Sequence, residues 1–212
     1  QVALPTFQAT HYVKSGLYSF SSHTFTNCGS TGKTGPTLAN CKSSYDVSWE
    51  NNTDYFNVPN DAGIQYWTVP VTGTYTIEAY GAQGGDVGGE GARMSGNFNL
   101  TQGDILKILV GQAGGTADNQ HGSGGGGSFV ATNVDTPLVV AGGGGGHGKS
   151  GLGSNADGAT TTSGKGGSNG TAAQGGSDGG GGSAAGTTGA GGTRTTNGSN
   201  VTSSTWSSGG GG

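Results

Sequence analysis

Residues 73–80 read Gly-Thr-Tyr-Thr-Ile-Glu-Ala-Tyr, and apolar and polar residues alternate along them. This period of two places Tyr75, Ile77 and Ala79 on one face of a strand, toward a core, with the other face in water. Other stretches rich in branched or aromatic residues extend the pattern of short strands: 17–26, 45–58, 64–69, 104–111, 127–131 and 137–141. No stretch keeps a sustained period of 3.6. The sequence predicts an all-β fold, a jelly-roll-like antiparallel sandwich with Trp49, Trp67 and Tyr75 in its core.

The composition excludes several classes of protein. Glycine accounts for 50 of 212 residues, where average usage gives roughly 15. With 9 % charged and 29 % hydrophobic residues, a helical bundle or a large doubly wound core is hard to build. The absence of a Gly-X-Y period excludes collagen. A net charge of −4 gives no basic stripe for nucleic acid, and no apolar run approaches the roughly 18 residues of a transmembrane segment.

The glycine content changes after Ala141. Residues 142–212 hold 28 of the 50 glycines, and their large apolar residues are Leu152, Val201 and Trp206. Disorder is one interpretation. The alternative is packing as polyglycine II helices, whose backbones bond to one another because no Cβ separates them. We therefore predict an N-terminal arm (1–15), a β-sandwich (16–141) and a polyglycine II region (142–212).

Several features favour the secretory route. The chain begins at Gln1 without a leader, as a processed protein does, and it stops within a glycine tract, so we expect it to continue past Gly212. Cys28 and Cys41 bracket a turn-rich segment, and a disulfide closing that loop would stabilise the fold by roughly 3 kcal/mol. Two unpaired thiols are the alternative.

N-glycosylation is the predicted modification. Asn-X-Ser/Thr acceptor sites occur at Asn51, Asn99, Asn169, Asn197 and Asn200. Their density is typical of an extracellular or cell-surface glycoprotein, with turn sites favoured over Asn99, which adjoins a strand. In a bacterial or phage protein the same sites would be coincidences.

An ordered series of motifs resembles the glycine-rich domain of the ectodomains of anaplastic lymphoma kinase and leukocyte tyrosine kinase. The motifs span roughly residues 20–146 and include Phe25-Thr-Asn-Cys-Gly, Gly63-Ile-Gln-Tyr-Trp-Thr-Val-Pro70, Gly81-Ala-Gln-Gly-Gly85, Gly124-Gly-Gly-Gly-Ser-Phe-Val130 and Pro137-Leu-Val-Val-Ala141 with its glycine tract. The resemblance implies a jelly-roll-like sandwich carrying polyglycine II helices, and binding of a small helical cytokine. The closing strand usual in that family is missing before Gly212, and residues 1–15 have no counterpart.

Motifs for catalysis are weak. Residues 143–150 satisfy the phosphate-loop pattern, but poor helix formers follow them. Residues 122–127 fit the dinucleotide pattern without a βαβ unit, and 166–170 and 175–179 mimic a nucleophile elbow without a preceding strand. His11, His23, His121 and His147 lack the spacing of metal ligands, so solvated histidines are expected. Scattered acidic residues lack a calcium-loop spacing. We predict no enzyme activity, cofactor or metal.

Three functions remain open. The leading hypothesis is a structural glycoprotein, the self-associating subunit of a filament, coat or matrix. The alternatives are a ligand-binding ectodomain of the receptor tyrosine kinase type and a phage-type adhesin. Residues 1–15 could add as a strand to the open sheet edge of a neighbouring subunit and so propagate a filament, or fold back on their own sandwich.

Overall fold

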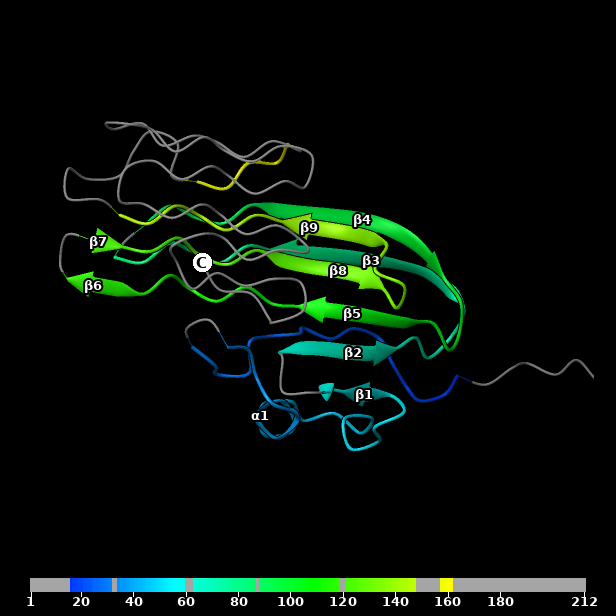
Figure 1. The fold of residues 1–212 in the computed structure, drawn as a ribbon. Coiled ribbons are helices and arrows are strands. Elements are labelled where there is room, and N and C mark those ends of the chain that lie inside the picture. The colour runs from blue at the N-terminus through cyan, green and yellow to red at the C-terminus, as the bar shows by residue number, and fades with distance from the viewer. Residues whose placement is uncertain are drawn as a thin grey trace, which may run out of the picture.

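The computed structural model describes residues 16–31, 34–59, 63–86, 88–118, 121–147 and 157–161, and these form an antiparallel β structure (Figure 1). Every pairing is antiparallel. The strands are β1 (Phe56–Asn57), β2 (Ile64–Thr68), β3 (Gly73–Tyr80), β4 (Arg93–Leu100), β5 (Ile105–Leu109), β6 (Thr116–Asp118), β7 (His121–Gly122), β8 (Ser128–Thr132) and β9 (Pro137–Ala141). A five-stranded sheet has the order β1-β2-β5-β8-β9, while β3–β4 and β6–β7 form separate two-stranded ribbons. The predicted all-β class is confirmed.

The β3–β4 ribbon packs against β8 and β9 and closes one side of the core. Tyr75 pairs with Phe98 and Ala79 with Met94, and all four side chains join the core cluster. The predicted strand at 73–80 is therefore confirmed. Its partner β4 was not predicted, because its apolar positions alternate with glycine, serine and asparagine residues, which have low strand propensity.

Aromatic rings fill the space between the sheets. Phe20 lies 5.0 Å from Trp67 and Tyr18 lies 5.6 Å from Trp49, measured between ring centroids. Trp49 and Trp67 are each 4 % exposed, so their predicted core position is confirmed. The prediction of strands at 17–26 and 45–58 is wrong except at Phe56–Asn57, because these segments cross the core as irregular chain and contribute rings rather than ladder hydrogen bonds.

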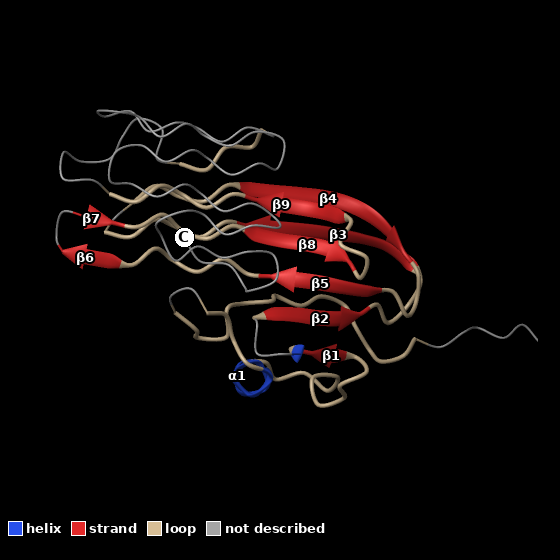
Figure 2. Cartoon of the chain, viewed as in Figure 1, coloured by secondary structure: helices blue, strands red, loops and turns tan. Residues whose placement is uncertain are grey.

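A short helix, α1 (Leu38–Ser44), occupies part of the segment between the cysteines and was not predicted. Thr37 caps it: the Thr37 hydroxyl accepts from the Asn40 amide, and the Asn40 side chain accepts from the Thr37 amide. This is a capping box with asparagine at the third position. The helix buries Cys41, and Figure 2 shows it beside β1 and β2, away from the β3–β4 ribbon.

Five strands continue directly into glycine-rich segments. The chain leaves β3, β5 and β9 into residues 81–85, 111–115 and 142–147, and it enters β4 and β8 from 88–92 and 122–127. Figure 1 shows these segments extending beyond the strands toward β6 and β7. The sandwich therefore sets where each glycine segment starts or ends. The predicted arm (1–15) and most of 142–212 lie outside the described residues.

Candidate functional site

The glycine segments bond to one another through their backbones with a repeat of three residues. In segment 81–85 the amides of Gly81 and Gly84 donate to Ala92 and Gly89, at 2.9 and 3.0 Å. The next residues along, Ala82 and Gly85, donate to Gly126 and Ser123, at 2.9 and 2.8 Å. Successive amides therefore face different neighbours and return to the same neighbour every third residue. Three residues per turn is the repeat of an extended polyproline II-type helix.

The same repeat recurs in the other segments. Gly89 and Ala92 donate to the carbonyls of Gly145 and Gly142, at 2.8 and 2.7 Å. Likewise Gly122 and Gly125 donate to segment 142–147, at 2.8 Å each. We call these five mutually bonded segments (81–85, 88–92, 111–115, 122–127 and 142–147) the glycine bundle. Its hydrogen bonds satisfy backbone groups that would otherwise be costly to bury.

Within each segment of the bundle, glycines three residues apart lie too close to a neighbouring segment to carry a Cβ, and Gly85 and Gly144 do so as well. A Cβ added at Gly81 or Gly84 would lie 1.9 or 2.0 Å from a carbonyl oxygen of segment 142–147. Approaches of 2.5 Å or less recur at the pairs Gly88 and Gly91, Gly111 and Gly114, Gly122 and Gly125, and Gly143 and Gly146. Real Cβ atoms do not approach backbone atoms so closely. The non-glycine residues, such as Ala82, Gln83 and Glu90, occupy other positions in the repeat.

Cys28 and Cys41 form a disulfide, with their Cα atoms 5.0 Å apart. Beside it the buried Gln65 side chain donates to the carbonyl of Thr26 at 2.7 Å and accepts from the Tyr45 hydroxyl at 2.6 Å. Burial raises the pKa of Tyr45, so its hydroxyl stays a neutral donor at physiological pH. The disulfide and the Gln65 contacts hold the loop preceding α1 onto β2.

His23 does not lie free in solvent, so that expectation is wrong for this residue. Its ring makes edge-to-face contacts with Phe25, Tyr45 and Trp49, with centroids 4.5 to 4.9 Å apart. Its Nε2 atom is buried and has no hydrogen-bond partner. Burial lowers the pKa of His23. The ring therefore functions in packing rather than as a ligand.

His147 ends the last described segment of the glycine bundle, and its Nδ1 lies 3.4 Å from Oδ2 of Asp86. Both side chains are mostly buried, at 21 % exposure each. A backbone hydrogen bond also connects the two segments, since the His147 amide donates to the Gly85 carbonyl at 3.2 Å. The pair joins the ends of segments 81–85 and 142–147 at one end of the bundle. Within the described ranges, no group of three or more histidine, cysteine or acidic residues could hold a metal ion.

The five predicted glycosylation sites divide into two sets. Asn51 lies in an exposed turn, and Asn99 lies on the exposed face of β4, where its Oδ1 accepts from Thr74 at 2.7 Å. That bond uses Oδ1 and not Nδ2, the atom to which a glycan would be attached. The other three sites, Asn169, Asn197 and Asn200, fall outside the described residues.

The phosphate-loop pattern at 143–150 overlaps the glycine bundle. The amide of Gly144 donates to Ala82 at 2.9 Å and its carbonyl accepts from Gly125, so these groups are engaged within the protein. Residues 148–150 and the elbow-like patterns at 166–170 and 175–179 are beyond the described part of the chain. Among the residues that are described, no helix is long and apolar enough to cross a membrane.

No model of a known protein family matches the chain. Part of it is nevertheless similar to a receptor. Over 96 residues the chain is 40 % identical to the leukocyte tyrosine kinase receptor of Mus musculus. The matched stretch is 42 % of this chain and 11 % of the receptor, so the chain spans a small part of that relative. This similarity and the disulfide point to an extracellular location.

Sequence reasoning missed that the glycine bundle begins at Gly81 rather than at Gly142. The signal was present in the spacing of the glycines. Pairs three residues apart recur after β3, before β4, after β5 and before β8. Long runs of glycine do not show this repeat, because the repeat occurs in segments where alanine, glutamine and serine lie between the glycines.

Proposed function

We propose that this chain is a non-catalytic extracellular module that binds a protein ligand, as part of a receptor ectodomain of the receptor tyrosine kinase type. The single observation that carries the proposal is the 40 % identity over 96 residues to the leukocyte tyrosine kinase receptor. Because of this similarity, the receptor-ectodomain function replaces the filament subunit as the leading proposal. The matched stretch is proposed to correspond to extracellular sequence of the receptor, which contains no kinase machinery.

The proposed architecture is a jelly-roll-like sandwich that carries a bundle of polyglycine II helices. The three-residue repeat of hydrogen bonds and the close glycine approaches support it. Each segment is fixed by neighbours on more than one side, so the bundle presents a rigid surface to a ligand. Rigidity lowers the entropic cost of binding, which suits a recognition module better than a flexible glycine linker would.

The binding experiment uses the full chain and a matched pair of glycine variants. The probe is the small helical cytokine that the family resemblance implies, titrated over the immobilised protein. A Cβ at Gly144 would lie 1.9 Å from the carbonyl oxygen of Gly89, whereas a Cβ at Gly142 meets nothing within 4 Å. We expect saturable binding by the wild type and by Gly142→Ala, and weaker binding by Gly144→Ala. Absence of binding by the folded wild type contradicts the receptor proposal.

A filament subunit is the second candidate, and the open sheet edges favour it. In the described part of the chain, β9 ends the five-stranded sheet and the β3–β4 ribbon is separate. Unpaired strand edges readily accept a strand from another chain. Residues 1–15 are the proposed donor.

Sedimentation velocity separates the two candidates. If the arm donates a strand, the intact chain polymerises and a variant lacking residues 1–15 is a folded, disulfide-bonded monomer. A monomeric intact chain at high concentration, or polymers of the truncated chain, would exclude the donated-strand filament.

A further inference from the structure

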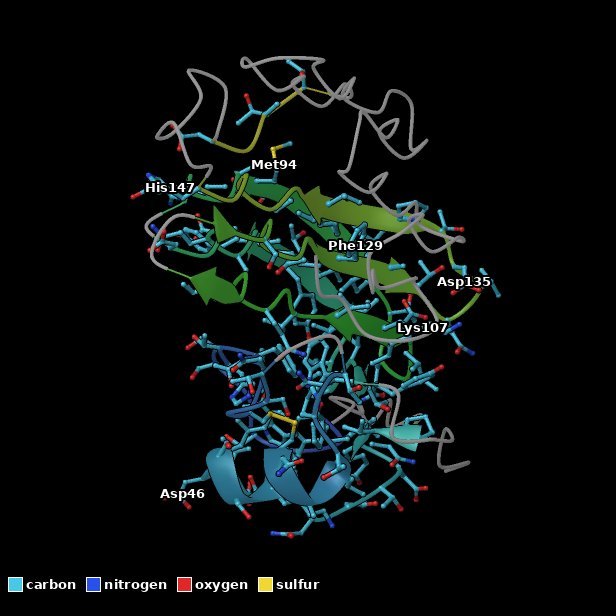
Figure 3. The ribbon with its side chains drawn as sticks, turned by 60° about the vertical axis from the view of Figure 1, so that its left-hand side comes forward. Asp46, Met94, Lys107, Phe129, Asp135 and His147 are labelled. Carbon is cyan, nitrogen blue, oxygen red and sulfur yellow. A yellow bond between two sulfur atoms is a disulfide. The ribbon has the colours of Figure 1, made fainter. Side chains whose placement is uncertain are left out.

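Two polar side chains at one end of the glycine bundle face each other without a hydrogen bond. Nδ1 of His147 lies 3.4 Å from Oδ2 of Asp86. Both atoms are buried, and neither has a hydrogen-bond partner among the described residues. Figure 3 shows His147 on the opposite side of the view from Lys107 and Asp135. Because buried polar atoms without partners are costly, the pair requires an explanation.

The separation of the two atoms fits neither a direct ion pair nor a bridging water. Charge-assisted N–H···O bonds close to about 2.7–2.9 Å, and the pair of Lys107 and Asp135 does so at 2.8 Å. A water between the two groups, with two bonds of about 2.8 Å, would hold them about 4.5 Å apart. The 3.4 Å between Asp86 and His147 falls between these values. Lone pairs held in this way are arranged like two ligands of one cation.

The separation matches two ligands of a tetrahedral zinc ion. Bonds from zinc to a histidine nitrogen and a carboxylate oxygen are about 2.0–2.2 Å long, so a tetrahedral angle places the two ligand atoms about 3.3–3.5 Å apart. Adjacent ligands of octahedral Mg²⁺, with bonds of about 2.0–2.1 Å, lie about 2.9 Å apart. An imidazole nitrogen also favours zinc and similar transition metals, whereas Ca²⁺ and Mg²⁺ prefer oxygen. The chemistry and the distance therefore indicate the same class of ion.

The backbone of the bundle holds both residues in position. The amide of Asp86 donates to the Thr116 hydroxyl at 3.1 Å. The carbonyl of His147 accepts from the Gly122 amide at 2.8 Å. Asp86 also has a left-handed backbone, with φ at 52°, which aspartate adopts more readily than most residues. Because neighbouring segments fix each of them, the two side chains form a preorganised pair, as a metal site requires.

We propose that Asp86 Oδ2 and His147 Nδ1 bind one Zn²⁺ ion, with water completing the tetrahedral coordination. The ion joins the ends of segments 81–85 and 142–147. Two protein ligands make a weaker site than the four of a structural zinc site, so we expect the zinc to be exchangeable. The proposal revises the sequence prediction of no metal, because the two ligands are far apart in the chain and only the bundle brings them together. The site goes beyond ligand binding and does not depend on it.

Calorimetric titration of Zn²⁺ into the chelator-treated full chain tests the site. We expect Asp86→Asn and His147→Phe each to weaken zinc binding about tenfold or more, since loss of even an outer partner of a metal ligand has an effect of that size. Asparagine tolerates the left-handed backbone, and phenylalanine keeps a ring. The matched control is His23→Phe, because the His23 Nε2 is also buried without a partner but its ring contacts aromatic residues. This control should bind zinc as the wild type does.

Amide hydrogen exchange of the wild type provides a second readout that needs no variant. The Gly122 amide donates to His147, and the His147 amide donates to Gly85. Zinc should slow exchange of these two amides severalfold and leave β5 unchanged, because the ion joins the segments that they connect.

Four results would overturn the proposal. The folded wild type does not bind zinc, or it binds Mg²⁺ as strongly as Zn²⁺. Zinc binding persists in both folded variants, which assigns the ion to other residues. Zinc binds without slowing exchange of the Gly122 and His147 amides.

Discussion

At the scale of single residues, the missing Cβ of glycine is what lets the bundle form. Its segments approach so closely that a methyl group at the repeat positions would overlap a neighbouring carbonyl. The gain is a set of backbone hydrogen bonds at 2.7 to 3.2 Å between segments far apart in sequence. The cost is the conformational entropy of ordering so many glycines. Substitutions should therefore depend strongly on their position in the repeat.

Two glycines of the same segment, Gly142 and Gly144, provide a matched test of this dependence. Gly144→Ala places a methyl group against the Gly89 carbonyl. We expect this substitution to lower the free energy of unfolding by about 1–3 kcal/mol or more, as overpacking does. Gly142→Ala has open space and should be neutral or stabilising by about 0.5 kcal/mol, because alanine restricts the unfolded chain. Denaturant unfolding measures both. Equal effects of the two variants would contradict the close approach of Gly144 to the Gly89 carbonyl.

His23 makes stability depend on pH. Burial lowers its pKa from the ordinary value of 6.5, so the folded state binds fewer protons than the unfolded state in this range. Stability is therefore fully present above about pH 6.5 and declines as the pH falls toward the folded pKa. Phe25, Tyr45 and Trp49 surround the ring, and none of them carries charge there.

The variant His23→Phe tests this pH dependence, because it keeps an aromatic ring but has no titrating group. Urea unfolding at pH 7.5 and pH 5 should show a smaller loss of stability in the variant than in the wild type. An identical loss in the two proteins would show that other groups, such as the carboxylates, produce the whole effect.

At the scale of elements, the loop from Cys28 to α1 depends on a covalent bond and a helix cap. The disulfide closes a sequence separation of 13 residues, and its reduction should cost about 3 kcal/mol. Thr37→Ala removes the cap and should cost about 1 kcal/mol with the disulfide intact. Thermal melts with and without reductant measure both effects. Two alkylatable thiols in native protein would contradict the disulfide.

The glycosylation sites belong to two different elements and should differ in occupancy. We expect Asn51, in a turn, to be modified more completely than Asn99, in β4. Thr53→Ala and Thr101→Ala each remove one acceptor motif. Thr53→Ala should remove one glycan from a larger fraction of the secreted protein than Thr101→Ala does. No mass shift on glycosidase treatment of native material would contradict the eukaryotic secretory assignment.

The sequence predicts the strands with strong apolar character, such as β3 and β5, because alternation and branched residues act locally. It does not reveal β4, whose asparagine and glycine residues are held by pairing with β3. The helix α1 is too short for a periodic signal, and its capping box is the available clue. The disulfide pairing follows from there being two cysteines. The contacts between glycine segments cannot be predicted from neighbouring residues in the sequence, because strand pairing brings together segments that are far apart in the chain.

At the scale of the whole molecule, the sandwich and the glycine bundle are one continuous structure. Strands β3, β4, β5, β8 and β9 each run directly into a bundle segment, so strand pairing aligns the segments for bonding. Because the sandwich fixes one end of each segment, we expect sandwich and bundle to unfold together in one transition. A ligand-binding surface on the bundle would then inherit the rigidity of the sheets.

Amide hydrogen exchange of the intact chain, resolved by residue, tests this account most directly. The donors Ala82, Gly84, Gly125 and Gly144 bond between segments and should exchange as slowly as amides of β5. In segments 81–85 and 122–126 the protected amides should come in adjacent pairs that recur with a period of three. The amide of Val134, in an exposed turn, should exchange fast and serves as the internal reference. Uniformly fast exchange in segments 81–92, 111–115, 122–127 and 142–147, with β5 still protected, would contradict a bonded glycine bundle.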